Sequence, residues 1–338
     1  MIPSGRVATL RGGSLAALLA FLAFSCGSSG NNFAGGGTGG TGISTGSIAA
    51  FGSVVVNGTH FRTDDDVAPG FRTKKMSNGT DQSDRAAKDV FAVGMVVTVR
   101  HVPGGNDAVE IDYGSNLLGP VAFRSPGPDN VVVVLGQSVV VENAAVFASL
   151  RQDDIVEVSG FADNAGRIRA VYVKPAAPPM PPPLREFETK GFVSGLSGNA
   201  FRLGPLPDGR GATVTVSYGS SAVSDLPAGP VEGMYVRVVT ADRAPDNGVI
   251  DAVRITRLTA RTEFPDNAPV RLEGLVTDPP SGSGKVLSFA VEGKRIRTDD
   301  ATDFTGHSPD EIRSNTRLQI QGTETGGVLS AGRIVFPQ

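Results

Sequence analysis

Two clusters of aspartates are the residues of this chain whose types and spacing suggest metal binding. The stretch VNGTHFRTDDD ends in three consecutive aspartates at positions 64–66, and the later stretch VEGKRIRTDDA carries Asp299 and Asp300. Carboxylate oxygens are the ligands that Ca²⁺ prefers, and the ion takes about six to eight of them. Neighbouring side chains of an extended strand point to opposite faces, so Asp64 and Asp66 can share a side but Asp65 cannot join them. The spacing of an EF-hand loop and its terminal Glu are absent.

The alternative interpretation is that these aspartates shape turns. Each cluster follows a run of alternating apolar residues, and the matching places elsewhere in the chain read VENAA and VSYGS. Asp and Asn favour such places because their side chains accept hydrogen bonds from nearby backbone N–H groups. We therefore predict turns, and no bound metal or other cofactor. The candidate ligands under the Ca²⁺ hypothesis are Asp64, Asp66, Asp299 and Asp300.

Other catalytic or metal-binding patterns are missing from the sequence. The three histidines, His60, His101 and His307, form no H-x-x-x-H pair, and we expect all three at the surface. With one cysteine in the chain and no paired Cys, a zinc site is disfavoured. No G-x-S-x-G nucleophile elbow occurs. The sequence thus predicts a protein that is not an enzyme.

The N-terminal residues have the pattern of an export signal. Arg6 and Arg11 precede the apolar run LAALLAFLAF, and the small residues of SCGSSG follow. This is typical of a secretory signal and too short for a membrane-spanning helix. The only cysteine, Cys26, stands at its end, and LAFSC resembles the lipobox of bacterial lipoproteins, although the favoured Leu lies one residue early. We predict a lipidated Cys26 that anchors an exported protein in the membrane; the alternative is ordinary signal cleavage beside a cysteine.

Four landmarks recur in the same order about every 75 residues, which indicates an internal repeat. The first is a Gly two residues before Val or Ile, and the second is a Gly followed by alternating apolar residues. The third is another alternating strand with a Gly-bearing turn after it, and the fourth is Ala-x-x-Ile or Ala-x-x-Val. The first landmark stands at Gly46, Gly119, Gly191 and Gly274, and the fourth begins at Ala108, Ala170, Ala252 and Ala331.

Each repeat predicts three strands, a helical turn and two more strands, because alternation with period two marks a strand with one buried face. This order occurs in five-stranded OB-like barrels; a small SH3-like barrel is the alternative. In the last copy, Ser308, Pro309 and Glu311 predict a capped helical turn. Asn57 and Asn78 begin NGT sequons that we interpret as turns, and the polar insertion around residues 68–89 predicts a mobile loop.

The predicted fold class is therefore all-β, with four tandem antiparallel barrels joined by linkers. The Pro-rich stretch KPAAPPMPPPLREFE predicts an extended spacer between the second and third barrels. The predicted boundaries are a signal peptide at 1–25, a Gly/Ser-rich tether at 26–42, barrels at 43–114 and 117–174, the Pro-rich linker at 175–188, a barrel at 189–258, a linker at 259–269 and a barrel at 270–338.

These landmarks resemble the family known as domain of unknown function 5666, small repeats of exported bacterial lipoproteins. The second copy, GPVAF…VVVVLGQSVVVENAAVFASLRQDDIVEVSGFADNAGRIRAVYV, carries the resemblance best. The shared features are glycines and strand alternation, so the resemblance implies a fold and an extracytoplasmic location but no activity. The third copy departs through its GPLPDGRGA insertion.

The functional expectation is a membrane-tethered protein of the bacterial envelope, periplasmic or at the outer membrane or cell surface. Repeated barrels favour multivalent binding of an envelope polysaccharide or protein. We expect no nucleic-acid partner, because such sites need a basic groove with aromatic platforms and the net charge is -3. Two alternatives remain: a structural spacer or scaffold, and a hydrolase or Ca²⁺-dependent enzyme whose site forms between repeats.

Overall fold

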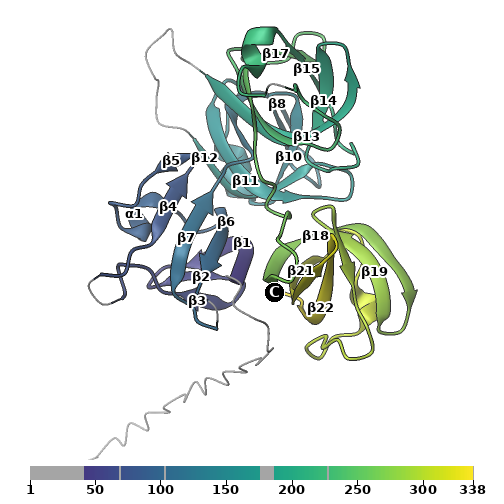
Figure 1. Cartoon of the computed structure of the whole chain (residues 1–338). Helices are drawn as coiled ribbons and strands as arrows, with labels where there is room; N and C mark the ends of the chain where they lie inside the picture. The colour runs from purple at the N-terminus through teal and green to yellow at the C-terminus, as the bar shows by residue number, and fades with distance from the viewer. Residues whose placement is uncertain (1–41, 68–69, 103, 176–185, 227, 338) are drawn as a thin grey trace, which may run out of the picture. The chain divides into compact units, whose positions relative to one another are not determined.

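The computed structural model describes residues 42–67, 70–102, 104–175, 186–226 and 228–337. The predicted signal peptide, Cys26, nearly all of the tether and most of the Pro-rich linker lie outside the described residues. Residues 38–338 belong to one compact unit. Strands make up most of the described chain, and the helices are single short turns (Figure 1). The predicted all-β fold class is confirmed: the strands form small five-stranded closed barrels in two sheets.

The second segment, residues 117–175, shows the strand arrangement in its simplest form. Its first strand pairs with the second and the fourth, and its second strand pairs with the third. The third strand pairs in parallel with the fifth, and the fifth pairs with the fourth. These pairings close the barrel around a core of Val, Leu, Ile and Phe side chains. The elements are β8 (Leu117–Ser125), β9 (Val131–Val134), β10 (Gln137–Val141), α2 (Ala144–Ser149), β11 (Ile155–Ala162) and β12 (Ile168–Pro175).

The third and fourth segments have the same order of pairings, each around its own apolar core. The third comprises β13 (Phe187–Ser197), β14 (Ala200–Gly204), β15 (Val214–Tyr218), η1 (Ser220–Val223), β16 (Tyr235–Thr240) and β17 (Val249–Arg257). The fourth comprises β18 (Pro269–Ser283), β19 (Val286–Val291), β20 (Lys294–Arg297), η2 (Pro309–Glu311), β21 (Arg317–Thr325) and β22 (Val328–Val335). At η2 the predicted capping box between Ser308 and Glu311 is present, with Pro309 in the first turn.

The first segment differs because its insertion is structured. Residues 74–81 form a hairpin, and its first strand extends the sheet by pairing in parallel with the last strand of the segment. The prediction of a mobile loop was therefore wrong for this part of the insertion, because the hairpin has a sheet edge to join. The elements are β1 (Gly42–Ala50), β2 (Val54–Val56), β3 (Thr59–Phe61), β4 (Lys74–Ser77), β5 (Thr80–Asp81), α1 (Ala87–Val90), β6 (Val96–His101) and β7 (Ala108–Tyr113).

Three of the four first-landmark glycines leave room for the hairpin turn that follows them. A Cβ added to Gly46 would lie 2.3 Å from Asn57 Oδ1, and one added to Gly119 would lie 2.8 Å from Leu135 Cγ. Asn57 and Leu135 both have positive φ, as the first residue of a type I′ turn requires. Gly274 and Glu292 make the same contact in the fourth segment. The landmark is therefore a packing requirement.

Strand pairing also joins segments that are distant in sequence. β1 pairs in parallel with β18, through residues 43–45 and 270–272, so the first segment shares a sheet with the fourth. β8 pairs with β13, so the second shares a sheet with the third. At the β1–β18 junction the buried Glu273 carboxylate accepts a hydrogen bond from the Ser47 backbone N–H and pairs with Arg317.

Candidate functional site

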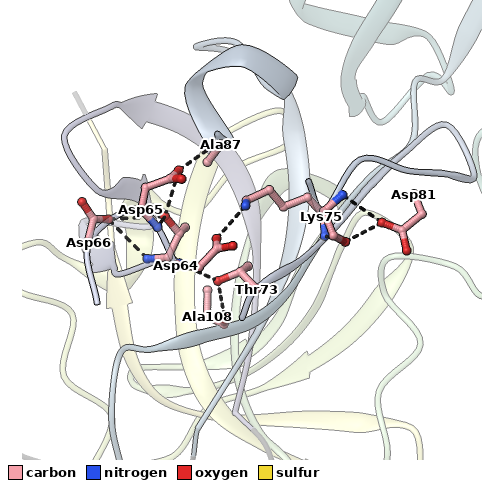
Figure 2. A network of polar contacts seen from close by, with 10 residues as sticks. Asp64, Asp65, Asp66, Thr73, Lys75, Asp81, Ala87 and Ala108 are labelled. Atoms are coloured by element: carbon pink, nitrogen blue, oxygen red, sulfur yellow. Dashed lines mark hydrogen bonds and ion pairs between the residues drawn. The ribbon is translucent and has the colours of Figure 1, made fainter. Parts of the chain in front are cut away.

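Asp64 forms a buried ion pair with a lysine from the inserted hairpin. Lys75 Nζ lies 2.6 Å from Asp64 Oδ1, and the lysine and aspartate side chains are 1% and 18% exposed (Figure 2). The local backbone holds the carboxylate in place, because Asp64 N–H donates to Thr73 Oγ1 and Thr73 Oγ1 donates to the Ala108 carbonyl. The Asp64 carboxylate is therefore neutralised by the Lys75 ammonium.

The other two aspartates of the triplet bond to different backbone groups. Asp65 Oδ2 accepts from the Ala87 N–H at 2.8 Å, which satisfies one of the free donors at the start of α1 (Figure 2). Asp66 Oδ2 accepts from the Thr63 N–H at 3.2 Å and closes the turn locally. Asp65 and Asp66 thus accept from different backbone N–H groups, and both lie within hydrogen-bond distance of the Thr63 hydroxyl, as turn residues do.

The second aspartate cluster repeats this backbone arrangement. Asp299 N–H donates to Thr302 Oγ1, which in turn donates to the Ala331 carbonyl, matching the Asp64, Thr73 and Ala108 contacts. Asp299 Oδ1 accepts from the Ala301 N–H, and the Asp300 side chain is exposed. Within the ranges that the structure covers, no group of three or more His, Cys, Asp and Glu is arranged to hold a metal ion.

One histidine is not where the sequence suggested. His101 is 9% exposed; its Nδ1 lies 2.8 Å from the Gly105 carbonyl oxygen, and its ring packs at 5.2 Å against Phe61. The surface prediction was wrong for His101 because the absent side chain of Gly42 leaves room for the imidazole on the neighbouring strand. His307 lies at the surface beside Glu311.

Both sequon asparagines are engaged in tertiary hydrogen bonds. The Asn57 amide nitrogen donates to the Thr45 and Arg271 carbonyls, so this buried side chain bridges the first and fourth segments. The Asn78 amide nitrogen donates to Glu157, and its oxygen accepts from Ser115. Both have the positive φ expected of the first residue in an Asn-Gly turn. Both amide nitrogens therefore take part in contacts that hold the fold together.

A small cavity brings together titratable groups from different segments. Lys190, Glu292, Tyr235 and Arg261 are among the residues that line it. Lys190 Nζ donates to the Ser115 carbonyl, and burial lowers the pKa of Lys190 to about 8. Burial raises the pKa of Glu292 to about 7, opposed by Arg261 and by hydrogen bonds from backbone N–H groups. With a volume of about 30 Å³ the cavity has room for water and not for a substrate.

A larger groove lies beside the linker that leads into the fourth segment. Its volume of about 480 Å³ is in the range of small-molecule sites. Lys294 and Glu324 form a buried ion pair here, with Nζ 2.7 Å from Oε1 and side chains that are 9% and 1% exposed. Lys294 Nζ lies 5.4 Å from the centre of the Phe264 ring. The remaining lining residues are Phe192, Pro207, Ala260, Thr262, Glu263, Asp266, Gly293 and Gly327.

Sequence reasoning missed this groove. Lys294 follows the glycine of a hairpin, and Glu324 lies at the end of β21, 30 residues later. Alternation indicates which strand positions face inward, but it does not indicate that two charged side chains face each other across a barrel. Phe264 belongs to a stretch whose only predicted role was that of a linker.

Comparisons with known proteins relate two parts of the chain to a domain family. Residues 119–174 and 273–335 match the family described as Domain of unknown function (DUF5666). No curated protein matches the chain. Among the described residues, no helix has the length and apolar character needed to cross a bilayer.

Proposed function

We propose that this chain, with its two matches to a domain family of unknown function, is a membrane-tethered binding protein of the bacterial envelope. The observation that carries the proposal is the groove of about 480 Å³ with the Lys294–Glu324 pair and Phe264. Apolar walls with a few fixed polar groups are typical of ligand sites. The catalytic alternative has less support, since the cavity where titratable groups converge has a volume of about 30 Å³.

We also propose that the four segments are repeats of one OB-like unit. In each, a helical turn precedes the fourth strand, and parallel pairing joins the second, third and fourth segments' third and fifth strands. In the first segment an isolated parallel bridge between Arg62 and Asp107 replaces that pairing. This order supports the OB-like alternative over the SH3-like one. The repeats would mainly position the groove, and the ligand would bind at the groove.

We propose that the membrane tether is an acyl chain on Cys26. Metabolic labelling with an alkyne-bearing fatty acid should mark the full-length protein in bacteria and should fail in Cys26→Ser, because serine offers no thiol to acylate. The measurement is in-gel fluorescence after coupling of a dye. Labelling that persists in Cys26→Ser would show that the acyl chain is attached elsewhere, and no labelling of the unaltered protein would favour an ordinary secretory signal.

Ligand binding at the groove can be tested with a substitution that blocks the groove with a bulky side chain. Glu263 is an exposed lining residue, so Glu263→Trp places an indole at the groove without disturbing the core. We expect retention of the purified chain on immobilised, detergent-solubilised bacterial envelope to fall at least tenfold in this variant. Asp84→Trp makes the same change at an exposed acidic residue of the first segment and should retain binding. Equal retention of the two variants would place the binding surface elsewhere, and no retention of the unaltered chain would favour the spacer hypothesis.

A further inference from the structure

We infer that the groove binds a neutral saccharide, an assignment that rests on the proposed binding function. The argument begins with the hydrogen-bonding groups of the ion pair. Lys294 Nζ is bonded to Glu324 Oε1, whereas the other carboxylate oxygen, Oε2, is buried without a hydrogen-bond partner in the described part of the chain. An ammonium has three N–H donors. The site therefore offers an acceptor beside a donor.

The fold does not require an ion pair at this place. In the second segment the residue after the corresponding hairpin glycine is Gln137, and its amide donates to Thr189 at 2.8 Å. A neutral side chain thus suits the same position in another barrel. Burying a charged pair is costly compared with a neutral or apolar alternative. The pair in the fourth segment is better explained by a function of the groove.

The charges that line the groove disfavour ionic ligands. Glu263 and Asp266 accompany Glu324, so an anion would meet three carboxylates and one ammonium. A cation would have to approach the Lys294 ammonium, which already lies 2.7 Å from Glu324 Oε1 and 5.4 Å from the centre of the Phe264 ring. A neutral ligand avoids both repulsions.

Adjacent hydroxyl groups match what the ion pair offers. Both groups are buried, so a ligand must displace the side chains that cover them before one hydroxyl can donate to Glu324 Oε2 and its neighbour can accept from Lys294 Nζ. Charge-assisted hydrogen bonds of this kind are strong. The part of the Phe264 ring that neither Lys294 nor the core covers provides an apolar contact for the C–H groups of a sugar ring. Vicinal diols with an apolar face are the defining chemistry of neutral saccharides.

The test is calorimetric titration of the purified full chain, kept in detergent, with defined probes. These are maltotriose, cellotriose and the trimer of N-acetylglucosamine as neutral saccharides, trigalacturonate as an anion and spermidine as a cation. We expect at least one neutral trimer to bind and neither charged probe to do so. Phe264→Ala and Glu324→Gln should each weaken binding at least tenfold, and Asp84→Trp should leave it unchanged.

Phe264→Ala or Glu324→Gln can disturb folding. Glu263→Trp tests the same site without that risk, because it blocks the groove from an exposed position. Binding of trigalacturonate or spermidine in place of the neutral trimers would overturn the saccharide assignment. So would binding of a neutral trimer that is insensitive to Glu263→Trp. If no trimer binds while envelope retention still depends on Glu263, the saccharide assignment fails and the proposed binding function stands.

Discussion

Asp64→Ala should lower the free energy of unfolding by about 3 kcal/mol, because it leaves the Lys75 ammonium buried without a partner. Lys75 is 1% exposed, so its ammonium has little contact with water that could compensate for the lost carboxylate. The measurement is urea unfolding followed by circular dichroism, with and without Ca²⁺.

A double-mutant cycle separates the ion pair from a metal site. If Lys75 is the partner of Asp64, then Asp64→Ala should cost far less in a Lys75→Met background, since no buried ammonium is left unpaired. Asp300→Asn, at an exposed aspartate of the equivalent turn, should have little effect. A cost that appears only in the presence of Ca²⁺, and persists with Lys75→Met, would instead support the metal hypothesis.

Glu292→Gln should stabilise the protein by about 3 kcal/mol at pH 7.5 and have little effect near pH 4.5. Burial raises the Glu292 pKa from 4.5 to about 7, so between these values the folded protein keeps a proton that the unfolded chain has released. The stability of the unaltered protein therefore falls as the pH rises through this interval and then levels off. Glutamine carries no charge at any pH, so the fall should disappear.

The pH profile contains an internal control. Burial lowers the Lys190 pKa from 10.5 to about 8, so between these values the unfolded chain holds a proton that the folded protein lacks. Stability should rise with pH in that range, both in the unaltered protein and in Glu292→Gln. Urea midpoints measured from pH 4.5 to 10.5 would show both slopes. A fall between pH 4.5 and 7 that survives in Glu292→Gln would assign that titration to another group.

Local patterns of the sequence predicted most of the barrel architecture. Period-two alternation and turn residues such as Asn57 act over a few positions, and the structure confirms the all-β barrels and the positive φ of that turn. The Ser308 capping box is equally local, and it is present. Each of these features depends on residues that are neighbours in the chain.

Contacts between distant residues could not be predicted in the same way. The Lys75–Asp64 pair arises because an insertion folds into a hairpin, and a polar composition alone suggested a mobile loop. Burial of His101 depends on a glycine in a neighbouring strand. The Lys294–Glu324 pair needs the closed barrel to bring two strands together. Sequence alternation carries no information on which strands become partners.

The parallel pairing of β1 with β18 means that the edge of the first segment is completed only by the fourth segment, which is synthesised later. Until β18 has emerged, the backbone N–H and C=O groups on the outer side of residues 43–45 face solvent as an open edge. Open edges recruit strands from other molecules. Prematurely terminated chains should therefore self-associate, so a laboratory producing this protein in pieces would do better to express residues 42–113 together with residues 269–335.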